Sequence, residues 1–232
     1  MRVSDIPKIR SLMLFKDMDE DSFSELTRAA YVQDFPPQVD LILEGDRCDF
    51  LHIMIDGSLE LFAEWNRHET ALTILRSGAT FILAAVVRDA PNLMSARTLE
   101  KSRVIMIPAE DVREIFQKDH EFARAVVMEL AYCYRGVVKG VKSLKLRTSI
   151  ERLANYLLKW QKKTGGSDSF TLGIEKRRLA SILGMTPENL SRAIKTLRPY
   201  GVEIDGQNVK ITDPDALKGL AKPSPLIDDP RS

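Results

Sequence analysis

The spacing of apolar residues changes twice along this chain of 232 residues. In the first 30 residues they recur at helical steps, as at Ile6 and Ile9, and the acidic run Asp19-Glu20-Asp21 suits the start of a second helix. From residue 31 to about residue 107 they form short runs between turn residues, which predicts strands. Beyond Pro108 the helical spacing returns. The pattern predicts an α+β protein.

The strand-rich region contains no predicted helix, and glycine and aspartate residues mark its turns. Its predicted strands lie at 41–43, 50–55, 58–62, 71–75 and 102–107. Asp56-Gly57 predicts a tight hairpin between the second and the third of these strands. A solvated hairpin tip is expected at Asn66-Arg67-His68-Glu69. Many short strands at near-regular spacing predict an N-terminal antiparallel β-roll.

A long helix is predicted from about Asp119 to residue 146. Apolar or small residues recur in it at alternating steps of four and three, at Val126, Leu130, Cys133, Val137, Gly140 and Leu144. This spacing is typical of the seam of a two-stranded coiled coil, so we expect the helix to form a homodimer. The sequence leaves open the alternative that the helix packs on its own β-roll.

Two short amphipathic helices joined by a tight turn are predicted between residues 173 and 197. Gly184 suits the left-handed end of the first helix, Thr186 can cap the second through its hydroxyl, and Pro187 falls at the first helical position. These features predict a helix-turn-helix. A small hairpin expected over 201–211 would form the wing of a C-terminal winged helix.

The start of the second helix carries side chains that suit the reading of bases in the DNA major groove. Arg192 can donate two hydrogen bonds to guanine, Glu188 can accept one from cytosine, and Ser191 is short enough to reach a base or a phosphate. The same surface is expected to present further polar and basic residues to DNA, namely Thr186, Asn189, Lys195, Arg177 and Arg178. The alternative is a helical hairpin with a solvated polar face.

Charge is distributed unevenly along the chain. The segment from Arg135 to Arg198 contains fifteen basic and four acidic residues, a net charge of +11, although the whole chain carries only +1. A basic C-terminal half joined to an acidic remainder is typical of a protein that binds nucleic-acid phosphates with one domain.

Other features exclude several classes of protein. Cys48 and Cys133 are far apart, which argues against a zinc or iron-sulfur site ligated by cysteines of one chain. Three histidines, His52, His68 and His120, do not have metal-ligand spacing, so an enzyme with a cupin-like roll is not expected. Without a signal-peptide core or an apolar run of membrane-spanning length, the protein is expected to be soluble and cytoplasmic.

The helix-turn-helix resembles that of a known family. Its residues Arg178-Leu179-Ala180, Leu183-Gly184, Glu188 and Ser191-Arg192 are similar to the xxLAxxLGxxxExxSR pattern of the CRP/FNR superfamily of bacterial transcription regulators. The order of roll, long helix and winged helix extends the resemblance over nearly the whole chain. The form of the motif looks most like the NnrR/DNR group, which responds to nitric oxide and controls denitrification genes.

The resemblance implies a domain order, a DNA site and a partner. We expect a cyclic-nucleotide-binding-like sensor roll at 1–118, a dimerisation helix at 119–146, a winged helix-turn-helix at 147–220 and a disordered Pro-rich tail at 221–232. Glu188, Ser191 and Arg192 would contact bases of TTGA-containing half-sites in double-stranded DNA. A twofold dimer would then read an inverted repeat, and RNA polymerase is an expected partner.

Within this family, the segment 81–96 argues against cyclic AMP as the signal. Members that bind cyclic AMP carry there a Gly-Glu pair and, about ten residues later, an Arg-Ser pair. Ala84 stands at the position of that carboxylate and Met94 at that of the guanidinium. Since an apolar pocket cannot compensate a buried phosphate, cyclic AMP is not expected unless Arg88 or Arg97 supplies the charge. The N-terminal cysteine cluster of oxygen-sensing FNR members is also absent, so no iron-sulfur cluster is expected.

A hydrophobic effector site would suit haem, through which nitric oxide could be sensed. The sequence does not choose among the possible ligands, which are His52, His68, His120, Cys48, Cys133, Met54, Met94 and the tyrosines. A second hypothesis keeps the fold but makes the protein a constitutive DNA-binding regulator, controlled by its abundance or by oxidation of a cysteine. The effector, the target genes and the choice between activation and repression are left open.

Overall fold

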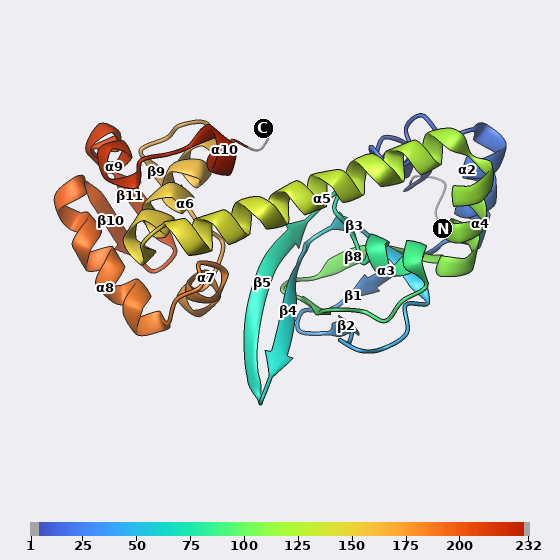
Figure 1. The fold of residues 1–232 in the computed structure, drawn as a ribbon, viewed down its shortest axis with the longest axis horizontal. Coiled ribbons are helices and arrows are strands. Elements are labelled where there is room, and N and C mark those ends of the chain that lie inside the picture. The colour runs from blue at the N-terminus through green and yellow to red at the C-terminus, as the bar shows by residue number, and fades with distance from the viewer. Residues whose placement is uncertain (1–4, 230–232) are drawn as a thin grey trace. The chain divides into compact units, whose positions relative to one another are not determined.

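The computed structural model describes residues 5–229, which form two compact units divided between Cys133 and Tyr134 (Figure 1). Helix α5, His120–Leu146, runs from the first unit into the second. It agrees closely with the long helix predicted from about Asp119.

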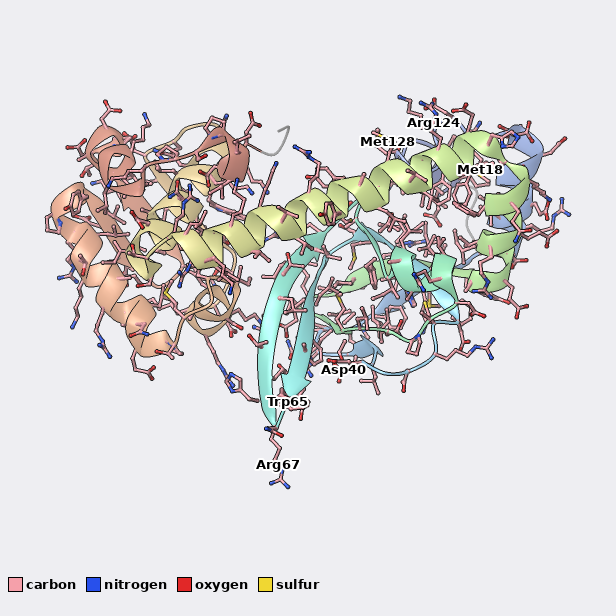
Figure 2. All side chains as sticks on the ribbon, in the orientation of Figure 1. Met18, Asp40, Trp65, Arg67, Arg124 and Met128 are labelled. Carbon is pink, nitrogen blue, oxygen red and sulfur yellow. The ribbon has the colours of Figure 1, made fainter. Side chains whose placement is uncertain are left out.

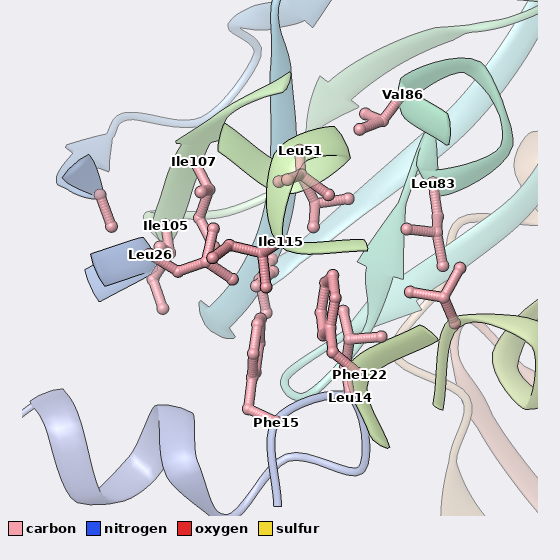
Figure 3. Close-up of a cluster of buried hydrophobic side chains, with 14 of the residues drawn as sticks. Leu14, Phe15, Leu26, Leu51, Leu83, Val86, Ile105, Ile107, Ile115 and Phe122 are labelled. Atoms are coloured by element: carbon pink, nitrogen blue, oxygen red, sulfur yellow. The ribbon is translucent and has the colours of Figure 1, made fainter. Parts of the chain in front are cut away.

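The first unit has an apolar core shared by helices and one face of a sheet. Its other helices are α1 Ile6–Arg10, α2 Glu20–Ala29, α3 Leu83–Arg88 and α4 Ala109–Lys118. The Asp19 carboxylate caps α2 by accepting hydrogen bonds from the amides of Asp21 and Ser22, which confirms the predicted helix start. In the core, Phe15 stacks on Phe122 at the start of α5, with ring centroids 6.1 Å apart (Figure 3).

The strands of this unit form two four-stranded antiparallel sheets, as predicted for a β-roll. One sheet has the order β1 Tyr31–Phe35, β8 Ser102–Pro108, β3 Phe50–Asp56 and β6 Thr80–Phe81. The other has the order β2 Asp40–Ile42, β7 Ser95–Thr98, β4 Ser58–Trp65 and β5 His68–Arg76. A second apolar cluster, which includes Met54, Leu59, Phe81 and Val104, takes residues from both sheets.

The hairpin predicted at Asp56-Gly57 is wrong, because β3 and β4 belong to different sheets. Gly57 has a φ of 92°, and a Cβ placed on it would lie 2.6 Å from the Oγ of Ser102. The chain thus turns tightly against the start of β8 and crosses to the other sheet. Since a turn signal is local, it marks where a strand ends but not with which strand it pairs.

The hairpin of this unit lies between β4 and β5. Its two-residue loop is Asn66-Arg67, with φ values of 50° and 62°, as a type I′ turn requires. Trp65 and Arg67 mark its tip in Figure 2, where the sequence predicted a solvated turn.

Helix α3 interrupts the strand-rich region, which contradicts the expectation that it contains no helix. Its buried residues Leu83 and Val86 are three apart, but six residues are too few for a helical period to stand out in the sequence. The preceding Ile82 has a left-handed backbone with φ 65°.

The second unit is a winged helix around the buried side of α6 Ser149–Lys163. It continues with β9 Ser169–Thr171, α7 Lys176–Ile182, α8 Pro187–Leu197, a 3-10 turn at Arg198–Tyr200, β10 Val202–Asp205, β11 Asn208–Ile211, α9 Pro214–Ala221 and α10 Pro225–Asp228. Thr148 and Glu151 form a capping box at the start of α6. The predicted wing hairpin pairs Val202–Asp205 with Asn208–Ile211, and β9 extends it to three strands.

The prediction of a disordered tail is wrong for the described residues 221–229. Ala221 ends α9, helix α10 follows, and the Asp228 carboxylate accepts hydrogen bonds of 2.7 and 2.6 Å from both terminal nitrogens of Arg147. A polar, Pro-rich composition predicted disorder because it does not reveal that one carboxylate has a specific partner. Residues 230–232 lie outside the described residues.

Candidate nucleic-acid interface

The turn between α7 and α8 has the geometry that its sequence predicted. Gly184 is left-handed at φ 61°, and its amide donates to the carbonyl of Ser181 at 2.8 Å. The Thr186 hydroxyl accepts from the Asn189 amide at 3.2 Å, and Pro187 occupies the first turn. A Cβ on Gly184 would lie 2.5 Å from a methyl group of Leu144, so this close approach of α5 to the turn requires glycine.

Helix α8 separates apolar from polar residues cleanly. Its buried residues are Leu190, Ala193, Ile194 and Leu197. Its exposed residues include the predicted DNA contacts Glu188, Asn189, Ser191, Arg192 and Lys195. The exposed set combines an acceptor, two short polar groups and two cations on one side of one helix, which is the chemistry of a base-reading helix.

The side chains of this face are in states suited to hydrogen bonding. Hydrogen bonds from the Glu188 backbone and from Thr186, together with the positive charge of Arg192, lower the pKa of Glu188. Glu188 is therefore an ionised acceptor at neutral pH. The Ser191 hydroxyl donates to the carbonyl of Pro187 at 2.9 Å and keeps its oxygen lone pairs available as acceptors.

The two arginines predicted on α7 differ. Arg177 is exposed. Arg178 is half-buried and forms an ion pair with Glu175 at 3.0 Å. Since its charge is already partly compensated, Arg178 contributes less than Arg177 to the positive field of this surface.

Arg152 on α6 supports the helix-turn-helix, although in the sequence it counts only as one of the fifteen basic residues between Arg135 and Arg198. Its Nε donates to the Leu183 carbonyl at 2.7 Å, one terminal nitrogen donates to the Gly184 carbonyl at 3.2 Å, and the other to the Arg147 carbonyl at 2.7 Å. The guanidinium thus ties the helix-turn-helix turn to the hinge between α5 and α6. Nothing in the sequence distinguishes it from a solvated basic residue.

The dimer seam predicted on α5 is wrong at its N-terminal end. Val126 is fully buried in the core of the first unit, and Leu130 packs against the same core. The open alternative, that the helix packs on its own roll, therefore holds for this part. Cys133 is exposed, as are Val137 and Leu144.

A different heptad register fits the exposed apolar residues of α5. It runs at steps of three and four through Val127, Leu130, Tyr134, Val137, Val141 and Leu144. All but Leu130 are large apolar residues exposed over about half of their surface or more, between 48% for Val141 and 69% for Tyr134. Within the described residues this stripe is exposed to solvent, and its spacing is that of a coiled-coil seam.

The residues expected to decide on cyclic AMP lie on and after α3. Ala84 is exposed on α3, Met94 is half-buried, and Arg88 is exposed. Arg97 on β7 is already engaged, since it donates to Asp40 at 2.6 Å and to Glu69 at 3.0 Å and lies 4.3 Å from the ring centre of Phe62.

His52 is the buried member of the three histidines. It lies on β3 and stacks on Phe81 with ring centroids 5.2 Å apart, and among the described residues its Nδ1 finds no hydrogen-bond partner. Burial lowers the pKa of His52 to about 4, so the imidazole is neutral at physiological pH. His68 and His120 are exposed. Within residues 5–229, no three His, Cys, Asp or Glu side chains gather in a way that could hold a metal ion.

The two thiols have raised pKa values. Burial and the neighbouring Asp49 raise the pKa of Cys48, and partial covering of the thiol together with Glu129 raises that of Cys133. Neither cysteine has the lowered pKa of a reactive thiolate.

No helix within the described part of the chain has the length and apolar character needed to span a membrane. The sites described above lie on the roll, on α5 and on the winged helix.

Comparison with known proteins places these observations in one family. The model of the cyclic nucleotide-binding domain matches residues 32–119, and that of the Crp-like helix-turn-helix domain matches residues 151–220. The chain is 22% identical over 215 residues to the CRP-like cAMP-activated global transcriptional regulator of Mycobacterium tuberculosis, covering 90% of this chain and 96% of the relative.

Solved structures show the same fold. FixK2 from Bradyrhizobium japonicum superposes with a TM-score of 0.72 at 17% identity, over 84% of this chain and 98% of that one. The sensor domain of the regulator DNR from Pseudomonas aeruginosa gives a TM-score of 0.50 at 17% identity, over 54% of this chain and 90% of that domain. With a cyclic nucleotide-binding domain followed by a Crp-like helix-turn-helix, and with transcription regulators rather than enzymes as its full-length relatives, the chain belongs to the CRP/FNR family of DNA-binding transcription regulators.

Proposed function

We propose that this regulator acts as a homodimer that reads an inverted TTGA-like repeat through α8. The observation that carries the proposal is the exposure of Glu188, Ser191 and Arg192 together at the start of a capped, well-packed helix. Arg192 would pair with guanine, Glu188 would accept from cytosine, and Ser191 would bind a base or a phosphate. Asn189, Lys195 and Arg177 would contact the sugar-phosphate backbone of the DNA.

The exposed stripe on α5 supports the proposed dimer. Regulators of this family act as dimers. Burying Tyr134, Val137 and Val141 against the same residues of a second copy would remove a long apolar stripe from water. A twofold axis along this seam would set two copies of α8 about one DNA turn apart, which suits an inverted repeat.

The signal proposed for this dimer is nitric oxide, sensed through haem, and not cyclic AMP. The engagement of Arg97 by two carboxylates and the lack of charge on α3 before Arg88 argue against an anionic ligand. His52 fits the chemistry of a haem ligand, because its imidazole is neutral and its buried Nδ1 makes no hydrogen bond within residues 5–229. Bound haem would supply an iron that takes up the gas, and His52 would hold it. The proposed targets are denitrification or nitrogen-oxide and low-oxygen response genes, with RNA polymerase as a partner in the cytoplasm.

One experiment tests DNA reading. The full-length protein is titrated with a duplex that carries an inverted TTGA repeat, over a series of salt concentrations, beside Arg192→Ala. The variant is expected to bind at least tenfold more weakly, since a bidentate arginine contributes about 1–3 kcal/mol of discrimination. Arg67→Ala on the roll hairpin is the matched control and should bind as wild type does. Equal binding by Arg192→Ala would overturn the assignment.

A second experiment tests the signal. Protein purified anaerobically and reconstituted with haem is examined by absorption spectroscopy before and after nitric oxide, beside His52→Ala and the exposed control His68→Ala. The proposal expects a Soret band that shifts with the gas in wild type and in His68→Ala, and a weakened band in His52→Ala. A protein that takes up no haem, or that binds DNA equally with and without nitric oxide, contradicts it.

The alternative is a constitutive regulator. It would be controlled by its abundance or by oxidation of Cys48 or Cys133, and the raised pKa of both thiols favours control by abundance. Full affinity for the inverted repeat in effector-free protein, unchanged by nitric oxide, would favour this alternative.

A further inference from the structure

The C-terminal segment 221–229 follows the matched helix-turn-helix domain, which ends at residue 220, and returns to the hinge between α5 and α6. The hinge is the short connection at Arg147 and Thr148, between the last turn of α5 and the first turn of α6. Every contact described below lies within the second compact unit.

The central contact joins Asp228 to Arg147. Two parallel hydrogen bonds of 2.7 and 2.6 Å connect the carboxylate with the guanidinium, and the Ser224 amide donates to the same carboxylate at 2.7 Å. Only 8% of the Arg147 side chain and 23% of the Asp228 side chain are exposed. A bidentate pair with so little exposure is geometrically specific, unlike a surface ion pair.

Three further hydrogen bonds hold the segment along its length. Lys139 on α5 donates to the Asp229 carbonyl at 2.7 Å, and Lys142 donates to the Leu226 carbonyl at 3.4 Å. At the beginning of the segment, the buried Asn155 of α6 donates to the Ala221 carbonyl at 2.6 Å. The segment is therefore bonded both to the helix before the hinge and to the helix after it.

The hinge is also bonded on the side of the DNA-binding motif. Arg152 donates to the Arg147 carbonyl and to the Leu183 carbonyl, both at 2.7 Å. Arg147 thus has its side chain bound to the tail and its carbonyl bound to the residue that holds the helix-turn-helix turn. A displacement of Arg147 would move both contacts.

We propose that residues 221–229 form a C-terminal clasp that fixes the angle between α5 and α6, and with it the position of α8 relative to the end of α5. The clasp works through its bonds to both sides of the hinge. Removal of Asp228 leaves the nearly buried Arg147 without its carboxylate, which makes the clasped arrangement unfavourable. In the dimer of the proposed function, the intact segment therefore sets the spacing of the two recognition helices.

Hydrogen–deuterium exchange of the full-length protein tests the clasp without DNA or effector. Asp228→Asn is compared with Asp215→Asn, an exposed aspartate of α9 whose partner is Lys218 at 3.0 Å. The amides around the hinge, in residues 144–152, are expected to exchange about tenfold faster in Asp228→Asn and unchanged in Asp215→Asn. Arg147→Lys, which keeps the charge but loses the bidentate geometry, should give a smaller increase.

The same variants are then titrated with an inverted TTGA repeat and with a single half-site. The clasp predicts a loss of about tenfold on the repeat for Asp228→Asn and no change on the half-site, because only the repeat depends on helix spacing. Hinge exchange equal to that of wild type overturns the clasp. Faster exchange with unchanged affinity for the repeat overturns its role in spacing. If wild type binds neither duplex, the proposed DNA site fails, while the exchange experiment still decides on the clasp.

Discussion

Arg192 on α8 and Arg97 on β7 carry the same side chain in opposite settings. Arg97 is bound to Asp40 and Glu69, lies over the ring of Phe62 and has the buried Glu60 carboxylate 3.8 Å away. Arg192 is exposed, beside Glu188 and Lys195 on the polar side of its helix. The comparison shows which cation is available to an anion outside the protein. Arg97 holds the roll together, whereas Arg192 is presented to a partner.

The largest effect is expected from replacing Arg97, which should lower the stability of the protein. Arg97→Met leaves three carboxylates without their shared cation, so the free energy of unfolding should fall by about 3 kcal/mol. Urea unfolding at neutral pH measures this. Arg67→Met at the hairpin tip, where the side chain is exposed, should change it by less than about 0.5 kcal/mol. Equal stability of the Arg97 variant and wild type would show that the cluster is not structural.

The next effect concerns the buried histidine of the roll and its dependence on pH. Since burial lowers the pKa of His52 to about 4, the unfolded chain binds a proton near pH 6.5 more readily than the folded protein does. Stability should therefore fall as the pH decreases from 6.5 toward 4, with a loss of about 2 kcal/mol at pH 5. His52→Phe, which keeps the stacking on Phe81, should lack this loss. An identical pH dependence of unfolding in both proteins would show that His52 does not cause the loss of stability at low pH.

A smaller effect on stability is expected at the hinge, where Thr148 and Glu151 form the capping box. Thr148→Ala removes the hydroxyl of the capping box at the start of α6 and should lower the free energy of unfolding by about 1 kcal/mol. Thermal unfolding followed by circular dichroism measures it. Thr148→Ser, which keeps the capping oxygen, should stay near wild type, and a loss as large as that of alanine would exclude capping as the cause.

The smallest effect separates the two arginines of α7. Arg177→Gln should weaken binding to all DNA sequences about threefold and reduce the slope of affinity against salt by about one ion. Arg178→Gln should do less, because Glu175 already compensates its charge. Salt titrations on one duplex compare the two variants. A larger effect for Arg178→Gln would contradict the claim that Arg177 contributes more to DNA binding.

The helix-turn-helix could be predicted residue by residue because its determinants are local. Gly184, Thr186 and Pro187 act on backbone within a few residues, and the buried and exposed sides of α8 follow from its own period. The partner of a strand is not local, and so the hairpin predicted at Asp56-Gly57 was wrong although both strands exist. The same holds for Val126, whose period fits a coiled coil but whose neighbours lie in the core of the roll.

The residues missed at the site are those whose role depends on one distant partner. Arg152 binds carbonyls about 30 residues later in the chain, and Arg147 binds a carboxylate 81 residues away. The sequence around an arginine does not show whether its guanidinium is solvated or forms a bidentate pair with a carboxylate. Only the folded backbone shows which carbonyl or carboxylate it reaches.

The most direct test of the central claim is base discrimination by Arg192. Wild type and Arg192→Ala are titrated, at one salt concentration, with the inverted TTGA repeat and with a repeat whose guanine is replaced by adenine. Wild type should prefer the TTGA repeat by about tenfold or more, and Arg192→Ala should bind both duplexes equally. A variant that retains the wild-type preference would contradict the claim that α8 reads the site through Arg192.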